Sequence, residues 1–414
     1  MSSIWRLFSL WIALSLLLEV TGGFAQAPPT PVSPNLVGDF EVDSKDLLLF
    51  LQGWLSDTSE INPDLDGNGQ IDSLDLFVFQ REWQTSTGLS GCSGTFSIHD
   101  QPDVEALAGC SSLDGNLLIQ DSDEDLDLRP LRHLESITGN LRIERNSGLT
   151  SIEGLSGLTE VMGNAVIWDN DVLTSIEGLR SLTHVGGNLQ IGVCHFSGCD
   201  GNPALTSLAG LENLIAVEGE FHVGDNDVLA NLEGLENLVM VGGRMAIGHN
   251  AGLQSFEGLD SIEYVGGTLF VDVNTELKSL DGLQSLERID GRTEVRRNEN
   301  LESLEGFQGL EYIGLNLEIR GNPKLASIQA LSNLRHVGEE VLVSDHPSLP
   351  SLDGLQGLTE SGTNLEISKN PLITTLQGLQ NITKVGGVLR IYENQSLTDI
   401  SALSNLTTFN STVI

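Results

Sequence analysis

The sequence predicts a mainly β protein, a solenoid of about twelve stacked coils that follows a small α-helical calcium module. Three observations predict it: a 24-residue repeat covers residues 115–414, each repeat holds a short strand of alternating apolar and polar residues, and an acidic loop precedes the repeats. The chain has 58 acidic and 20 basic side chains, so its formal net charge is −38. Because phosphates would be repelled, this charge argues against nucleic acid or an anionic membrane as a partner.

The N-terminal residues 1–27 are typical of an export signal. Arg6 supplies a positive start, residues 7–18 form an apolar run, and Ala25-Gln26-Ala27 offers small residues for cleavage. A membrane anchor is the alternative, but the run is short for a bilayer and an acidic residue follows it. Residues 28–34 are a proline-rich spacer. No later run has transmembrane length, so we expect a protein secreted or held at the surface of a bacterial cell.

An acidic loop within residues 35–85 predicts a calcium site of the EF-hand type. Oxygen ligands fall at loop positions 1, 3, 5, 9 and 12, and position 7 supplies a backbone carbonyl. The predicted ligands are Asp64, Asp66, Asn68, the Gln70 carbonyl, Asp72 and Asp75. Gly69 stands where the loop must turn sharply. An acidic surface turn is the alternative, and the number of ligands in register disfavours it.

The same loop resembles a dockerin repeat, because an aspartate ends it and an apolar helix-like stretch follows. A weaker upstream copy offers Asp39, Asp43 and Asp46, with Phe40 in place of the turn glycine. The resemblance covers residues 35–85 and implies calcium-dependent docking to a cohesin-like protein. The positions at which that family contacts its partner correspond to Ser44, Lys45, Ser73 and Leu74.

Successive repeats begin 24 residues apart, except for one step of 32 between Gly187 and Gly219. An asparagine follows nearly every strand, where its amide can satisfy backbone groups in its own coil and the next. This asparagine column comprises Asn146, Asn170, Asn202, Asn226, Asn250, Asn274, Asn298, Asn322, Asn370 and Asn394, and Ser122 and His346 replace the amide. We expect the column to be structural and the stacked coils to share one apolar core.

The repeats resemble the leucine-rich-repeat superfamily and, more closely, the receptor L-domain, a right-handed β-helical solenoid. Residues 86–114 then form a linker and an N-terminal cap, in which the resemblance implies that Cys92 and Cys110 are bridged. The family also implies an extracellular recognition or structural surface and no catalysis. Cofactors other than calcium are not implied.

The longer repeat contains an insertion with Cys194 and Cys199. An exported protein can form disulfides, so we favour a local bridge that stiffens the loop. The alternative is a metal site that includes His195, which lacks a fourth ligand nearby.

A second acidic run occupies residues 121–127. Alternation would place four aspartates on one side of an extended chain, as a second calcium site would need. The run has no turn glycine, so we favour a solvated acidic turn.

The outward position of each first strand forms a column along the solenoid. It runs through Leu118, Arg142, Val166, Gln190, His222, Ala246, Phe270, Glu294, Glu318, Leu342, Glu366 and Arg390. Trp168, His222 and Phe270, with Arg142 nearby, are the candidate partner-binding residues. The alternative is that these side chains have no binding role and are ordinary exposed residues of a solvated sheet.

The sequence contains no catalytic motif in a fitting context, and its eight histidines are scattered. We therefore predict a secreted, non-catalytic binding or scaffold protein that docks through its calcium module and recognises protein or glycan with its solenoid. One alternative is a subunit of a polysaccharide-degrading assembly, non-catalytic or weakly hydrolytic. Another is a structural protein of the cell envelope or of adhesion.

Overall fold

The computed structural model describes residues 90–195 and 198–413. Contacts divide the chain into two units, and Gly91–Leu107 with Ser111–Ile414 form the unit that contains the solenoid. The predicted export signal, spacer and calcium module, with all their predicted ligands and contact residues, lie outside the described residues. Among the described residues, no helix is both long and apolar enough to cross a membrane.

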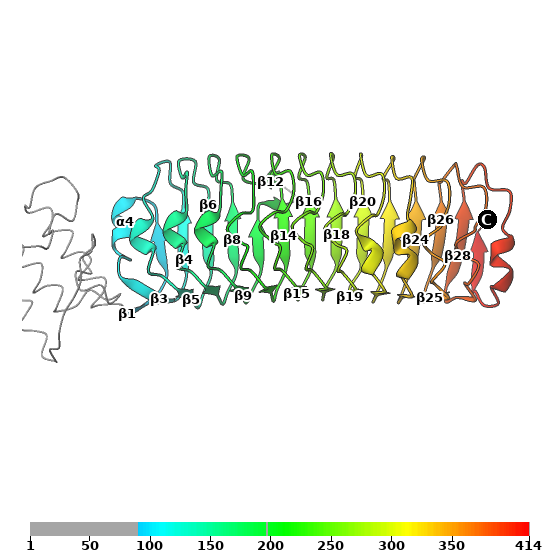
Figure 1. Cartoon of the computed structure of the whole chain (residues 1–414), viewed down its shortest axis with the longest axis horizontal. Helices are drawn as coiled ribbons and strands as arrows, with labels where there is room; N and C mark the ends of the chain where they lie inside the picture. Colours follow the sequence, from blue (N-terminus) through cyan, green and yellow to red (C-terminus); the bar gives the residue numbers. More distant parts are fainter. Residues whose placement is uncertain (1–89, 196–197, 414) are drawn as a thin grey trace, which may run out of the picture. The chain divides into compact units, whose positions relative to one another are not determined.

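The first strands of the coils form one parallel 14-stranded sheet, as the repeat predicts (Figure 1). Its strands are β2 (Phe96–Ile98), β4 (Leu117–Gln120), β6 (Leu141–Glu144), β8 (Ala165–Trp168), β10 (Leu189–Ile191), β14 (Phe221–Gly224), β16 (Met245–Gly248), β18 (Leu269–Asp272), β20 (Thr293–Arg296), β22 (Leu317–Arg320), β24 (Val341–Ser344), β26 (Leu365–Ser368), β28 (Val388–Tyr392) and β29 (Ser411–Val413). The predicted solenoid is confirmed: the described residues form a β-solenoid of about 13 turns, and the predicted helical module lies outside them.

The sheet begins one strand earlier than the repeat predicts. Strand β2 lies in the segment that we assigned to the linker and cap, and its Phe96 pairs with Leu117 of β4. This offset is 21 residues, whereas Leu117 pairs with Leu141 at the usual 24. A search for a 24-residue period therefore does not detect the first coil.

A second parallel sheet of 11 strands lies on another side of the coils. Its strands are β1 (Ser90–Ser93), β3 (Cys110–Asp114), β5 (Ser136–Ile137), β7 (Glu160–Val161), β9 (His184–Val185), β13 (Ala216–Val217), β15 (Met240–Val241), β17 (Tyr264–Val265), β19 (Arg288–Ile289), β21 (Tyr312–Ile313) and β23 (His336–Val337), and β25 (Glu360–Ser361) with β27 (Lys384–Val385) form a separate pair. Six short 3-10 helices complete some of the coils: η1 (Arg129–Leu131), η2 (Glu153–Leu155), η3 (Glu177–Leu179), η4 (Phe307–Gly309), η5 (Gln329–Asn333) and η6 (Ser401–Asn405).

The asparagine column runs through the interior and bonds each coil to its neighbours, as predicted. The Asn250 amide donates to the Val223 carbonyl at 3.0 Å, and its oxygen accepts from the Asn226 N–H at 3.1 Å. The residue before it, His249, adopts a left-handed conformation with φ 60°, which turns the asparagine inward. Asn250 and its equivalents in most coils are fully buried. The column is therefore structural.

His346 takes the place of an asparagine in this column. Its Nε2 lies 3.0 Å from the Ile319 carbonyl, and its Nδ1 lies 3.3 Å from the Asn322 N–H. Burial lowers the pKa of His346 below its ordinary value. The neutral ring therefore supplies one donor and one acceptor, as an amide does.

A second amide column precedes the first strands in the N-terminal coils. The oxygens of Asn116, Asn140, Asn164 and Asn188 accept the N–H of the equivalent residue one coil later, at 2.8–2.9 Å. The sequence analysis did not identify this column. In the next coils, Glu220, Arg244, Thr268 and Arg292 occupy the position instead.

The N-terminal end of the stack is covered by a short cap. Helix α4 (Gln101–Glu105) begins at Asp100, whose carboxylate accepts the Asp103 N–H, and it buries Val104. Cys92 and Cys110 are both disulfide-bonded, and they lie on the neighbouring strands β1 and β3. The two cysteines for which the L-domain resemblance implies a bridge are thus in the disulfide state.

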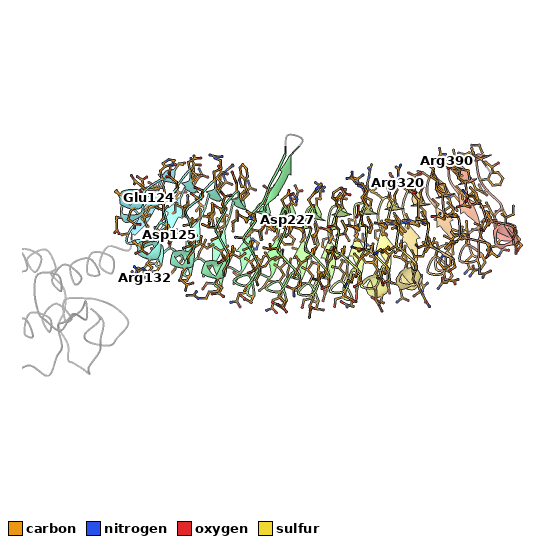
Figure 2. All side chains as sticks on the ribbon, turned by 90° about the horizontal axis from the view of Figure 1, so that it is seen from above. Glu124, Asp125, Arg132, Asp227, Arg320 and Arg390 are labelled. Atoms are coloured by element: carbon orange, nitrogen blue, oxygen red, sulfur yellow. The ribbon has the colours of Figure 1, made fainter. Side chains whose placement is uncertain are left out.

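The insertion forms an antiparallel hairpin of β11 (Val193–His195) and β12 (Gly198–Asp200). Its register places Cys194 opposite Cys199, so the backbone suits the bridge that the sequence predicts. Figure 2 shows the hairpin projecting on the side of the solenoid where Arg320 and Arg390 are labelled. Beyond the hairpin the sheet keeps its register, because Gln190 pairs with His222.

Candidate functional site

The outward side chains of the 14-stranded sheet, here called the outer face, contain the predicted column of twelve residues. Register confirms that these positions are direct neighbours from strand to strand, for example Ala246, Phe270 and Glu294. Two positions later on each strand, a second outward row includes Trp168, Asp272 and Arg296. Two aromatic clusters stand out on this face.

The first is the Trp168 cluster, formed by Trp168, Glu144, Arg142 and Arg145. The Glu144 carboxylate is buried at 4% exposure, although it lies on the outer face. It accepts hydrogen bonds from the Trp168 indole at 2.8 Å, from Arg142 Nε at 2.9 Å and from Arg145 at 3.3 Å. Arg145 also pairs with Asp121 at 2.7 Å. Each arginine of this cluster therefore already holds a carboxylate of the protein.

The second is the Phe270 cluster, formed by Phe270, Arg244, Arg296, Asp272 and Arg297. The Arg244 and Arg296 guanidinium groups lie 4.6 and 4.7 Å from the centre of the Phe270 ring. Asp272 is buried at 2% exposure and pairs with Arg297 and, at 3.6 Å, with Arg296. Phe270 thus holds two guanidinium groups in place through cation–π contacts.

His222 lies on β14 between the two clusters. Its ring covers Gly224, since a Cβ added there would lie 2.7 Å from His222 Nε2. Three strands separate β8, with Trp168, from β18, with Phe270, which corresponds to about 19 Å at the usual strand spacing. The three candidate residues therefore belong to separate places on the outer face rather than to one patch.

Two exposed arginines lie next to the Phe270 cluster, Arg292 before β20 and Arg320 at the end of β22. Within the described ranges, neither forms an ion pair with another side chain. Across β16–β22 and their flanking residues, the outer face carries five arginines against three carboxylates. Those arginines are Arg244, Arg292, Arg296, Arg297 and Arg320. This local excess of positive charge contrasts with the net charge of −38 for the chain.

Carboxylates continue the outer face toward the C-terminus. Burial, followed by the nearby negative charge of Glu294, raises the pKa of Glu318 above its ordinary value. Farther along, Glu366 accepts hydrogen bonds from Tyr392 at 2.8 Å and from Ser368 at 2.9 Å. These groups border the arginines but lack the paired aromatic contacts of the Phe270 cluster.

The acidic run at residues 121–127 is bonded to the protein itself. Asp121 accepts from Arg145, whose hydrogen bond lowers the pKa of that carboxyl, and Asp125, labelled in Figure 2, accepts from Thr150 at 2.8 Å. In the part of the chain that the structure describes, no three His, Cys, Asp or Glu residues are grouped to hold a metal ion. The run has the contacts of an acidic turn.

The 11-stranded sheet carries a stacked column that the sequence analysis missed. The Arg288 guanidinium lies 3.9 Å from the centre of the Tyr312 ring, which stacks on His336 at 4.7 Å. Tyr264 donates to Asp290 at 2.7 Å. Because these groups cover one another's faces, the column stabilises successive coils rather than offering an open stacking surface.

Parts of this chain are similar to known proteins. The family model described as the receptor L domain matches residues 109–180. Among solved structures, the chain is similar to an internalin (inlF) from Listeria monocytogenes strain 4b F2365, with 16% identity, a TM-score of 0.35 and coverage of 76% of this chain and 88% of that one. It is also similar to the functional domain of InlJ from Listeria monocytogenes, with 16% identity, a TM-score of 0.27 and coverage of 78% and 71%. A comparison with curated proteins gave no match. The similarity to the receptor L domain thus covers the first coils of the solenoid, residues 109–180.

Proposed function

We propose that the protein is a secreted, non-catalytic binding protein whose outer face, at β16–β22, binds a protein partner. The observation that carries the proposal is the arrangement around Phe270: two guanidinium groups fixed on its ring, and two exposed arginines beside them without an ion pair in the described residues. The forked guanidinium group of arginine binds a carboxylate through two parallel hydrogen bonds. An arginine that is held in place before binding loses less conformational entropy when the partner binds.

The second amide column supports the proposal. Each backbone N–H accepted by an asparagine contributes about 1 kcal/mol to stability. The column stops in the coils where Glu220, Arg244, Thr268 and Arg292 take its place. Three of these four coils therefore present a charged side chain at the position that holds a structural asparagine in the N-terminal coils.

A protein partner fits the Phe270 cluster better than a glycan. Sugar rings are bound by stacking on open aromatic faces, and two guanidinium groups already lie over the Phe270 ring. The Trp168 indole N–H is likewise bonded to Glu144. The alternative that the protein is a subunit of a polysaccharide-degrading assembly is supported only by the dockerin resemblance of residues 35–85.

Two variants test the outer face. Immobilised full-length protein should capture a defined protein from the secreted fraction of its source, and the double charge reversal Arg292→Glu with Arg320→Glu should abolish that capture. Arg335→Glu is the matched control, because Arg335 is an exposed arginine outside the 14-stranded sheet. If both variants capture the same proteins as the unaltered chain, the outer face is not the binding site.

The calcium module is proposed as a separate docking element. Asp64→Asn with Asp66→Asn should remove two of the predicted ligands, and chelation should release the same docking partner from the unaltered chain. The outer-face capture should not change in either case. A docking partner retained after chelation would contradict the calcium mechanism.

A further inference from the structure

The 11-stranded sheet carries an exposed apolar patch at two neighbouring strands, β13 and β15. Ile215, which precedes β13, is 54% exposed, and Ala216, Val239 and Met240 beside it are partly exposed. Ala216 pairs with Met240, and the Val239 N–H donates to the Ile215 carbonyl at 2.9 Å. The four residues are therefore direct neighbours in two adjacent coils, and we call them the Ile215 patch.

Other coils place polar side chains where Ile215 and Val239 stand. Backbone hydrogen bonds and the 24-residue spacing align these two residues with a polar column: Glu135, Thr159, Thr183, Glu263, Glu287, Glu311, Arg335, Thr359, Thr383 and Thr407. The coil therefore does not require an apolar residue at this position. Neighbouring exposed apolar side chains that the fold does not need indicate a surface for contact with another molecule.

Carboxylates border the Ile215 patch. Residues 181–243 contain no lysine or arginine and eight acidic residues: Asp200, Glu212, Glu218, Glu220, Asp225, Asp227, Glu233 and Glu236. The Glu218 side chain, two residues after Ala216, is 60% exposed and lies 3.4 Å from His184. Glu263, whose N–H donates to the Val239 carbonyl, forms no ion pair with any described residue. The surface is thus apolar at its centre and negative at its border.

We propose that the Ile215 patch binds a segment of another protein in which apolar side chains are flanked by lysine or arginine. The apolar side chains of that segment lose their contact with water against the patch, and its cations pair with Glu218 and Glu263. A second copy placed patch to patch brings the same carboxylates together, and an anionic membrane is repelled by them. The patch is opposite in charge to the arginines of the outer face, so the two faces take different partners.

Fluorescence anisotropy of a labelled peptide with the full-length chain tests the proposal. The probe has central leucines with lysines on both sides, and two reference peptides carry serine in place of leucine or glutamate in place of lysine. We expect the leucine–lysine probe to bind at least about tenfold more tightly than the serine peptide, because only the leucines can be buried against the patch. The glutamate peptide should not bind.

Three variants locate the binding on the surface. Ile215→Thr with Val239→Thr should remove the preference for leucine over serine, and it should fold because threonine occupies the same position in other coils. Glu218→Gln with Glu263→Gln should weaken the binding of both lysine peptides and reduce its salt dependence. The matched control is Val228→Thr, which should leave binding unchanged: Val228 is 49% exposed in the same acidic stretch but lies outside the 11-stranded sheet.

Equal binding of the leucine and serine peptides overturns the proposal, as does a preference that Ile215→Thr with Val239→Thr leaves intact. Sedimentation of the peptide-free chain detects the other possible occupant, a second copy. An oligomer that the same double variant separates would mean that a second copy covers the patch, and it would also overturn the proposal.

Discussion

The Trp168 and Phe270 clusters are built from the same kinds of side chain and connected differently. Each has an aromatic ring, a buried carboxylate and several arginines on the outer face. Tryptophan has an N–H that donates to Glu144, so both arginines of that cluster join it around the carboxylate. Phenylalanine has no donor, and the Arg244 and Arg296 guanidinium groups lie over its ring. The arginines of both clusters also pair with carboxylates, in the second case Arg244 with Glu220 at 3.3 Å and Arg296 with Glu294 at 3.6 Å. What distinguishes the second cluster is its neighbours Arg292 and Arg320, which form no ion pair in the described residues and can accept an anionic group from outside.

The largest difference between the clusters should appear when two arginines are removed from each. Arg142→Ala with Arg145→Ala leaves the buried Glu144 with the Trp168 indole alone, which should cost about 3–5 kcal/mol. Arg244→Ala with Arg296→Ala leaves Asp272 paired with Arg297, so the loss of the ring contacts and of the partly exposed pairs with Glu220 and Glu294 should cost about 1–2 kcal/mol. Urea unfolding followed by circular dichroism measures both. Equal losses would mean that both clusters are structural.

Changing the aromatic residues should separate stability from binding. Trp168→Phe removes one donor to a buried carboxylate and should cost about 1–2 kcal/mol, with partner capture unchanged. Phe270→Leu removes the aromatic face that fixes two guanidinium groups and should weaken capture by about tenfold at a stability cost near 1 kcal/mol. Loss of capture in Trp168→Phe would place the binding surface nearer to the first cluster.

Acid should weaken the coils around His346 more than the coils that hold the two clusters. Burial keeps the pKa of folded His346 below its ordinary value of 6.5, so the unfolded chain takes up the proton first as the pH falls. Stability is complete above about pH 6.5 and should decrease below it by up to about 1.4 kcal/mol per pH unit. His346→Asn restores the amide and should flatten this loss between pH 7 and pH 5. An unchanged pH profile would show that other groups cause it.

The smallest effect should come from Glu318, beside the Phe270 cluster. Burial and Glu294 raise the pKa of this carboxyl, so its folded form binds a proton more readily than its unfolded form. Glu318 therefore makes the fold less stable as the pH rises from about 4.5 toward the folded value. Glu318→Gln should recover at most about 0.5 kcal/mol at pH 7 after solvent screening, and nothing below pH 4. Exposed Glu299→Gln is the control.

Periodicity alone predicted the solenoid, the outward column and the asparagine column. The reason is that stacking forces equivalent residues of successive coils into register, as for Phe270 and Glu294. Strand β2 of the cap was not predicted, because its offset to β4 differs from the 24-residue repeat. The second amide column was not identified from the sequence, because only some coils contain it.

The side-chain contacts on the outer face could not be predicted from the spacing of the repeat. Trp168, His222 and Phe270 were correctly placed on outward positions, but the contacts of Phe270 depend on arginines from the preceding and following coils. Whether Arg296 lies on a ring or turns toward Asp272 is decided by side-chain rotamers, which a repeat pattern does not specify. The same holds for Arg288, Tyr312 and His336 on the second sheet. The ligands of the predicted calcium loop lie outside the described residues and stay a prediction.

The hairpin β11–β12 shows where the length of this chain is not constrained. It inserts after β10 and before Asn202, and the strands on both sides of it keep their pairing, with Ile191 opposite Val223. The junction between strand and asparagine is therefore an entry point for new sequence, at which a loop can be lengthened or exchanged without repacking the interior. Because the hairpin projects on the side of the outer face (Figure 2), such an exchange would change the surface beside that face while leaving the stacked coils unchanged.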